Sequence, residues 1–351
     1  MAKAIDLHSH YVGADAVARI RDEGEQHGVT VVKGDGPPRL DVGGRITGLP
    51  LIPGLTDTEL RQNWLEVAGV DVQLVAGWMD LAGYHLPLED GRWLAEVQND
   101  AIAALVATAP DRYVAAAAVP LQDPEAAAKE LDRAVTQLGH RAVQIGARVE
   151  ETGLDDPALD PFWTAVEQRD VLVVIHPAEL SVPDRHRRLF LHILTGNPAE
   201  TTHAAAAIML GGVLDRFPRL RFLLVHGGGY LPYQLGRLTM GVVAAPPPVR
   251  SRSARTPREH LASFYFDTVL HDDTALRYLA DVVGTDHVVL GSDYPFPMRD
   301  DSPLATAERA IRDSATISST ASGLLGGVLL LRAELAERSM NTSERSLRSE
   351  P

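Results

Sequence analysis

The sequence contains no cysteine and very little lysine. The absence of cysteine excludes disulfide bonds, thiolate metal ligands, iron–sulfur clusters and cysteine nucleophiles, so any transition metal must be held by histidine and carboxylate side chains. Lysine occurs only at Lys3, Lys33 and Lys129, and arginine carries nearly all of the positive charge. The 13 histidines, by contrast, offer ample ligands and proton carriers.

Positive net charge and long hydrophobic runs are also lacking. The 33 basic and 47 acidic side chains give a formal charge of −14, which argues against a nucleic-acid or anionic-membrane surface. No run approaches the roughly 18 apolar residues of a membrane span, and the opening MAKAIDLHSH has no apolar signal region. With 45% hydrophobic residues, the chain can build a sizeable core. We therefore expect a cytoplasmic globular protein with neither nucleic acid nor membrane as a partner.

Eight short apolar runs alternate with helical patterns along the 351 residues. Most of these runs are continuous rather than alternating, as in strands that are buried on both faces. The runs are Ala4–His10, Asp71–Gly77, Tyr113–Pro120, Arg141–Ala147, Val171–Pro177, Arg221–Gly227, Phe264–Val269 and Val288–Pro295. The predicted helices are Asp57–Ala68, Arg92–Ala107, Pro124–Leu138, Asp160–Arg169, Pro198–Arg216 and Asp272–Val283. This order predicts an α/β fold, a (β/α)8 TIM barrel; a doubly wound open sheet is the alternative, but no glycine-rich phosphate loop follows the first run.

Two stretches interrupt the alternation. Residues 34–53 are rich in glycine and proline and read as a long insertion after strand one, placed like a lid over the active face of the barrel. Residues 244–257 carry three consecutive prolines and are expected to form a surface excursion. We predict a single barrel over residues 1–338 and a flexible polar tail over 339–351.

Polar residues recur where the predicted strands end, which is where barrel enzymes place their chemistry. His8 and His10 lie two apart on one strand, so their side chains point the same way and can bind one cation. His176, His226 and Asp293 follow strands five, six and eight. Each alone is compatible with a structural role, but together they predict one divalent metal held by His8, His10, His176 and Asp293, with His226 beside it. Three imidazoles and one carboxylate suit zinc with an open position for water, whose pKa such an ion lowers towards about 7.

The motifs DLHSH, IHP, VHGGG and GSDYPFP together resemble the amidohydrolase superfamily. More narrowly, the chain is similar to the decarboxylase branch typified by α-amino-β-carboxymuconate-ε-semialdehyde decarboxylase. The resemblance extends through VPLQDPEAAAKELDRAV, LDDPALDPFW and NPAET and covers about Ala4 to Pro297.

The resemblance implies roles for particular residues. The implied zinc ligands are the four already named, and His226 would be the catalytic acid/base that activates metal-bound water. Asp293 would be a catalytic residue as well as a metal ligand. Substrate-binding roles are implied for Arg45, Arg237 and Phe296, with Arg237 supplied across a homodimer interface to the neighbouring site. Superfamily members with two metals carry a bridging lysine on strand four; residues 141–147 contain none, which favours a single ion.

The predicted function is metal-dependent nonoxidative decarboxylation of a small unsaturated or aromatic carboxylic acid. The first alternative is a metal-dependent hydrolase that opens a lactone, a cyclic amide or a related bond at the same site. A third interpretation is a binding protein with a structural zinc ion, whose coordination sphere would then be closed.

Overall fold

The computed structural model describes residues 3–34, 36–178, 188–247 and 250–326. The predicted tail over residues 339–351, and the domain boundary at residue 338, lie outside these ranges. Within them, no helix is both long enough and apolar enough to cross a membrane.

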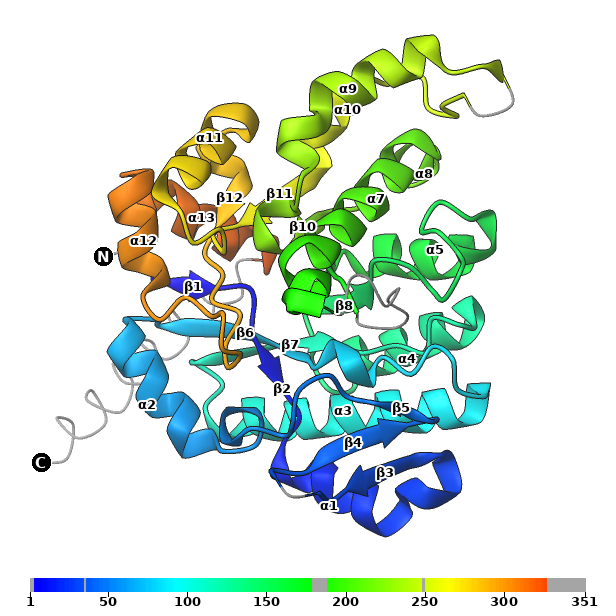
Figure 1. Ribbon diagram of the computed structural model, residues 1–351, viewed down its shortest axis with the longest axis vertical. Helices are drawn as coiled ribbons and strands as arrows, with labels where there is room; N and C mark the ends of the chain where they lie inside the picture. Colours follow the sequence, from blue (N-terminus) through cyan, green and yellow to red (C-terminus); the bar gives the residue numbers. More distant parts are fainter. Residues whose placement is uncertain (1–2, 35, 179–187, 248–249, 327–351) are drawn as a thin grey trace, which may run out of the picture.

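Parallel strands form the centre of the molecule in the order β1-β6-β7-β8-β9-β10-β11-β12. Strands β1 and β2 both pair with β6, β1 near its start and β2 near its end. Isolated parallel bridges from Asp6 to Leu290 and from Ser9 to Tyr294 join the first strand to the last segment and complete the ring. The strands are β1 (Ile5–Asp6), β2 (His10–Tyr11), β6 (Val72–Gly77), β7 (Tyr113–Ala117), β8 (Ala142–Gly146), β9 (Leu172–His176), β10 (Phe222–Leu224), β11 (Phe264–Asp267) and β12 (Val288–Val289). Because β1 and β2 are two pieces of the first strand, the eight predicted strands and the TIM barrel are confirmed (Figure 1).

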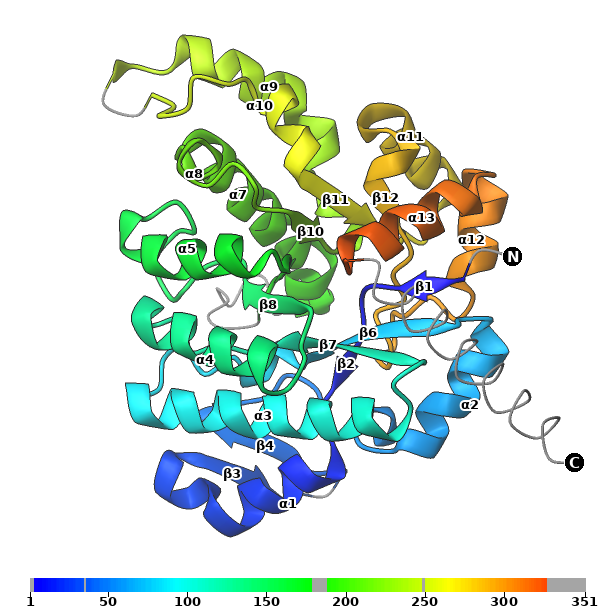
Figure 2. The same cartoon turned by 180° about the vertical axis from the view of Figure 1, so that it is seen from behind.

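The predicted helices lie outside the barrel between successive strands (Figures 1 and 2). They are α2 (Thr58–Ala68), α3 (Leu88–Thr108), α4 (Pro124–Thr136), α5 (Asp160–Arg169), α7 (Asn197–Leu210) with α8 (Val213–Arg216), and α11 (Asp273–Val283). Asp57, Asp123 and Asp272 start three of them by accepting hydrogen bonds from first-turn backbone N–H groups. The sequence did not predict α1 (Ala14–Glu23), α9 (Leu231–Ala244), α10 (Pro257–His260), α12 (Pro303–Ala310) and α13 (Ser314–Leu324).

Alternate strand residues fill the interior of the barrel. Val72, Leu74 and Ala76 of β6 point inward with their counterparts on the other strands, and Leu324 of α13 packs against the same cluster. The opposite faces of the strands pack against the helices in a larger cluster that includes Phe162 of α5. The strands are therefore buried on both faces, which is why their sequences are continuously apolar.

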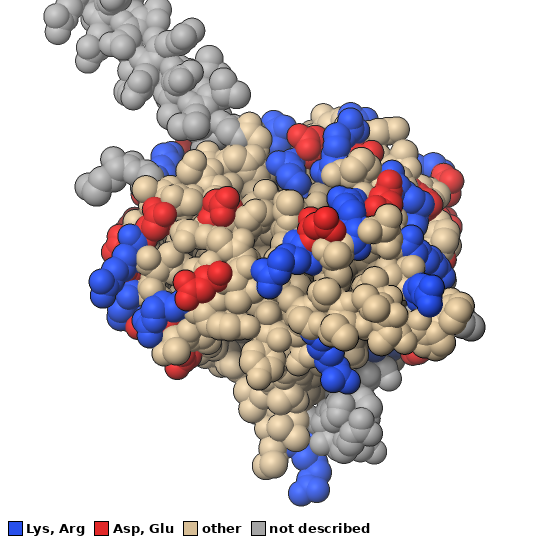
Figure 3. Space-filling model, turned by 90° about the horizontal axis from the view of Figure 1, so that it is seen from above, with Lys and Arg blue, Asp and Glu red and all other residues tan. Residues whose placement is uncertain are grey.

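The insertion after the first strand is confirmed, but it is wider and more regular than the sequence predicts. It begins with α1 and contains an antiparallel sheet of β3 (Val29–Val32), β4 (Arg39–Val42) and β5 (Arg45–Ile46). This sheet has its own apolar cluster beside α3, on the lower side of the barrel in Figure 1. Seen from above, acidic and basic side chains are interspersed over the surface (Figure 3).

Candidate metal centre and active site

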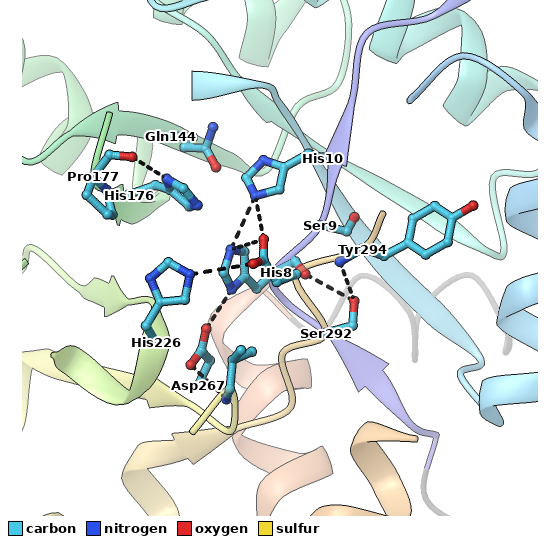
Figure 4. A network of polar contacts seen from close by, with 12 residues as sticks. His8, Ser9, His10, Gln144, His176, Pro177, His226, Asp267, Ser292 and Tyr294 are labelled. Atoms are coloured by element: carbon cyan, nitrogen blue, oxygen red, sulfur yellow. Dashed lines mark hydrogen bonds and ion pairs between the residues drawn. The ribbon is translucent and has the colours of Figure 1, made fainter. Parts of the chain in front are cut away.

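Side chains from four strands meet at the carboxyl ends of the barrel strands. Figure 4 shows His8, His10, His176 and His226 gathered there. One ligand atom from each of His8, His176, His226 and Asp293 lies within 4.8 Å of the other three. His10 joins the same cluster, because its Nε2 lies 3.3 Å from Nε2 of His8 and 3.2 Å from Oδ1 of Asp293. The barrel thus brings together all five residues that the sequence assigns to the metal centre.

Local backbone geometry aims two of these side chains. His226 and Asp293 have φ angles of 55° and 61°, in the left-handed region that few residues other than glycine adopt. His226 opens the short turn η7 (His226–Gly228), and Asp293 lies between β12 and the Tyr294-Pro295 peptide. Such conformations persist only where surrounding structure holds them, and they cluster at functional sites.

Hydrogen bonds from behind the rings set the tautomers of three histidines. In each, Nδ1 faces an acceptor, so the neutral ring carries its proton there and directs the Nε2 lone pair at the centre. The pairs are His8 Nδ1 with Asp267 Oδ2 (2.7 Å), His10 Nδ1 with the Gly77 carbonyl (3.1 Å) and His176 Nδ1 with the Pro177 carbonyl (2.6 Å). Nδ1 of His226 is buried and has no such partner within the part of the chain that the structure describes. The four histidines therefore divide into three that are prepared as ligands and one that is not.

The donor set fits a divalent cation. Nε2 of His176 and Oδ1 of Asp293 are buried without a hydrogen-bond partner among the described residues. Burial, reinforced by neighbouring histidines, holds the pKa of His176 well below its usual value, so its ring is neutral. Burial alone would raise the pKa of Asp293, but the histidines around it outweigh burial and hold this pKa well below its usual range. A neutral His176 ring beside an ionised Asp293 carboxylate matches the protonation states that metal binding requires.

A buried polar network fixes the strand segments that carry the ligands. Asp6 accepts hydrogen bonds from the backbone N–H groups of His8 and Ser292, from Oγ of Ser292 and from Nε2 of Gln73. Burial is the main cause that raises the pKa of Asp6 to about 6. Arg61 is fully buried behind this network and donates to Gln73 Oε1 at 2.6 Å and to the carbonyl of His10. The network ties the first strand to the segment that follows the last strand.

A cavity of about 300 Å³ opens over the metal centre. His176, His226 and Asp293 lie in its wall, together with the polar residues Asp80, Asn197 and His271. The rest of the wall is largely apolar and includes Leu49, Trp78, Met79, Phe190, Ile193, Leu194, Leu270, Phe296 and Met298. The ring of Phe296 lies 5.1 Å from that of His10, so this predicted substrate-binding residue lies directly beside the centre.

The two predicted substrate-binding arginines lie elsewhere. Arg45, on β5, makes two hydrogen bonds of 2.9 Å to the carboxylate of Glu150 in the loop after β8. Arg237 lies exposed on α9. Neither residue belongs to the wall of the cavity.

Sequence reasoning missed Asp267 and Arg61, which hold ligands without being ligands. Asp267 ends the seventh strand, so the rule that singled out the other strand ends could have found it. Arg61 lies on α2 among ordinary polar residues, and nothing in the local pattern distinguishes it from a solvated charge.

Comparison with known proteins agrees with the fold and the site. The chain belongs to the amidohydrolase family, whose characteristic sequence matches residues 83–321. It is 35% identical over 271 residues to 2-amino-3-carboxymuconate-6-semialdehyde decarboxylase of Dictyostelium discoideum, covering 77% of this chain and 75% of that protein. It is 33% identical over 223 residues to gamma-resorcylate decarboxylase of Rhizobium sp. (strain MTP-10005), covering 58% and 66% of the two chains. Crystalline 5-carboxyvanillate decarboxylase from Sphingomonas paucimobilis superposes with a TM-score of 0.75 at 25% identity, over 93% of this chain and 99% of that one. The predicted resemblance to the decarboxylase branch is confirmed.

Proposed function

We propose that the protein is a carboxy-lyase that catalyses metal-dependent nonoxidative decarboxylation of a small unsaturated or aromatic carboxylic acid. The observation that carries this proposal is the preset ligand cluster of three Nε2 lone pairs and Asp293 at the base of a largely apolar cavity. The decarboxylase relatives support the same reaction type. An apolar wall suits the hydrocarbon part of such an acid, and the polar base suits its carboxylate.

For the metal we propose one divalent ion, zinc, with His8, His10, His176 and Asp293 as ligands. His226 is assigned a different role because no residue in the described ranges offers its Nδ1 an acceptor and because its side chain is 19% exposed at the cavity, whereas the side chain of His10 is fully buried. A bound divalent cation would supply positive charge next to the negative charge that develops on the substrate.

In this assignment His226 moves the proton. Decarboxylation breaks the bond between the carboxyl carbon and its neighbour; the carboxyl group leaves as carbon dioxide, and the electron pair on the remaining carbon takes up a proton. Nε2 of His226 lies in the cavity wall, 3.7 Å from Oδ2 of Asp293, where it can hold that proton and release it towards the substrate. Trp78, Leu270 and Phe296 line the cavity, and their apolar side chains would keep bulk water away from the reacting carbon.

Product analysis tests the reaction. The metal-loaded protein is incubated with carboxylated aromatic acids and with muconate semialdehydes; carbon dioxide release supports decarboxylation, whereas a product heavier by one water supports the hydrolase. His226→Ala should keep the metal but lose turnover, while His203→Ala, at an exposed position on α7, serves as the control. Undiminished turnover in His226→Ala would refute the role given to His226. Elemental analysis of the purified protein tests whether the ion is zinc.

We propose further that the protein is a homodimer in which Arg237 reaches the neighbouring site and, with Arg45, orients the substrate carboxylate. Helix α9 supports a contact here because, besides Arg237, it exposes Tyr233, Met240 and Val243. Arg45 would exchange Glu150 for the substrate carboxylate, which its planar guanidinium can bind in the same two-pronged way.

Subunit mixing tests this arrangement. Arg237→Ala and His226→Ala are each expected to be inactive, but a mixed dimer regains one complete site. An equal statistical mixture should recover about a quarter of the wild-type activity if the dimers exchange freely. A monomer in sedimentation, or no recovery on mixing, would contradict the shared site.

A further inference from the structure

Asp267 is a fully buried carboxylate at the end of β11 that the reaction described above does not use. It does not belong to the cavity wall, and its two oxygens serve different partners. Oδ2 lies 2.7 Å from Nδ1 of His8, whereas Oδ1 accepts hydrogen bonds from the backbone N–H groups of Gly227 (2.8 Å) and Val269 (3.1 Å). Figure 4 shows Asp267 below His8 and beside His226.

We propose that Asp267 is a positioning residue that fixes the tautomer of His8 for metal binding and, through the same carboxylate, anchors the turn that carries His226. The proposal rests on the proposed function for the role of His226, but its effect on the metal is independent of the reaction catalysed. The Asp267 side chain would thus hold the metal ligand His8 and the proton carrier His226 in fixed positions relative to each other.

The turn held by Asp267 needs an anchor. Both His226 and Gly227 have left-handed φ angles, 55° and 60°, and a histidine in that region is strained. A hydrogen bond from the N–H of Gly227, the very next residue, to a buried carboxylate is charge-assisted and about twice as strong as a neutral one. This bond is therefore well placed to hold the backbone of His226 in its strained conformation.

The close approach of Asp267 to the first strand depends on Gly291. A Cβ atom at Gly291 would lie 2.7 Å from Cβ of Asp267 and 3.0 Å from both its Cγ and its Oδ2. Any larger residue would displace the carboxylate from Nδ1 of His8. Gly291, in the GSD motif, therefore leaves room for the carboxylate of Asp267. This carboxylate lies on β11 and orients His8 on the first strand, two strands away around the barrel.

Asp267→Asn should reverse the tautomer of His8. The amide oxygen of the new side chain would be held by the N–H groups of Gly227 and Val269, so its NH₂ group would face Nδ1 of His8. Two donors cannot face each other, and His8 would move its proton to Nε2. The lone pair that faces the metal would be lost although the side chain keeps its shape. Asp267→Ala leaves His8 free to choose either tautomer.

Metal affinity in the full-length protein separates this mechanism from simple packing. We expect the zinc affinity of Asp267→Asn to fall by at least 10- to 100-fold, the usual effect of losing a ligand's hydrogen-bond partner, and the affinity of Asp267→Ala to fall less. A packing role predicts the opposite order, because alanine leaves a cavity and asparagine does not. The d–d absorption of bound cobalt should likewise change more in Asp267→Asn than in Asp267→Ala.

Asp272→Asn is the matched control. It is the same chemical change five residues along the chain, at an exposed helix start where asparagine caps as well as aspartate, so zinc affinity and melting temperature should stay at wild-type values. Zinc affinity in Asp267→Asn equal to wild type, or lower affinity in Asp267→Ala than in Asp267→Asn, would overturn the proposal.

A measurement on the wild-type chain covers the case in which the asparagine variant does not fold. In the metal-free protein, at a pH high enough for the His8 ring to be neutral, nitrogen-15 spectra of the imidazoles should show His8 with its single proton on Nδ1; a single proton on Nε2 would refute the proposal. Neither readout involves turnover. If the wild type releases no carbon dioxide but these results hold, the proposed function fails while the tautomer role of Asp267 stands.

Discussion

His140 makes the stability of the protein depend on pH in a way that can be calculated. The residue precedes β8 and its side chain is fully buried. Neither of its ring nitrogens makes a hydrogen bond of good geometry to any described residue. Burial is the main cause that lowers the pKa of His140 from 6.5 to about 4. The folded chain therefore resists protonation of His140, while the unfolded chain takes up the proton near pH 6.5.

The direction and the size of the change in the free energy of unfolding follow from the difference in proton binding between the unfolded and the folded chain. Above about pH 6.5 His140 is neutral in both states and costs nothing. As the pH falls from 6.5 to 4, the unfolded state binds the extra proton and the folded state loses stability, in total by about 3 kcal/mol at 1.36 kcal/mol per pKa unit. About 2 kcal/mol of this loss should appear between pH 7 and pH 5.

Urea unfolding of wild type and His140→Leu at pH 7, 6 and 5 measures this effect. The variant should lose about 2 kcal/mol less than wild type over that range, because leucine has a similar volume and no proton to bind. Other titrating groups, including those of the metal centre, are common to both proteins and cancel in the difference. His203→Leu, where solvent reaches the ring in the folded and the unfolded chain, should behave as wild type. Equal pH slopes for wild type and His140→Leu would refute the reasoning.

Three further outcomes follow from the structure. Gly229→Ala should lower the free energy of unfolding by more than about 2 kcal/mol and remove most of the activity. The reason is that φ of Gly229 is 61° and the new Cβ would lie 2.1 Å from the carbonyl oxygen of Pro198. Gly236→Ala, with open space around it on α9, is the control, and its melting temperature should equal or exceed that of wild type. Arg61→Met should lower the free energy of unfolding in urea by about 3–5 kcal/mol, because buried acceptors on Gln73, His10 and Gly54 lose their donor at about 1–3 kcal/mol each; an effect below about 1 kcal/mol would contradict this. Removal of the metal with a chelator should lower the melting temperature reversibly, since free metal at 1,000 times its Kd stabilises the fold by about 4 kcal/mol; unchanged melting would argue against a bound ion.

Local sequence predicts the barrel strands well and several helices poorly. Strands such as β9, LVVIH, are buried on both faces, so burial shows directly as a continuous apolar run. Helix α13, SATISSTASGL, is rich in serine and threonine, which favour helices weakly, and it is held by packing against the end of the barrel. The glycine- and proline-rich stretch around β4 and β5 looks irregular because its strands are short and their pairing is set by β3, which precedes it.

The ligand cluster could be predicted from the sequence because the barrel fold places the ends of its strands together. Side chains that follow parallel strands meet at one end, so His8, His176 and Asp293 could be grouped before their distances were known. This arrangement does not reach residues outside the strand ends. Arg45 illustrates the difference: its pairing with Glu150 joins two loops whose relative placement no local pattern encodes.

The sequence by itself determined the barrel, the family and the residue types of a metal centre, because strand burial, strand order and ligand chemistry are local properties of the chain. The tertiary structure decided which nitrogen of each histidine faces the centre, since this depends on acceptors supplied from elsewhere: Asp267 behind His8 and the carbonyl of Gly77 behind His10. It also decided that, among the residues the structure describes, none places such an acceptor on Nδ1 of His226. Ligand and proton carrier are the same amino acid, and only their surroundings in the folded chain distinguish them.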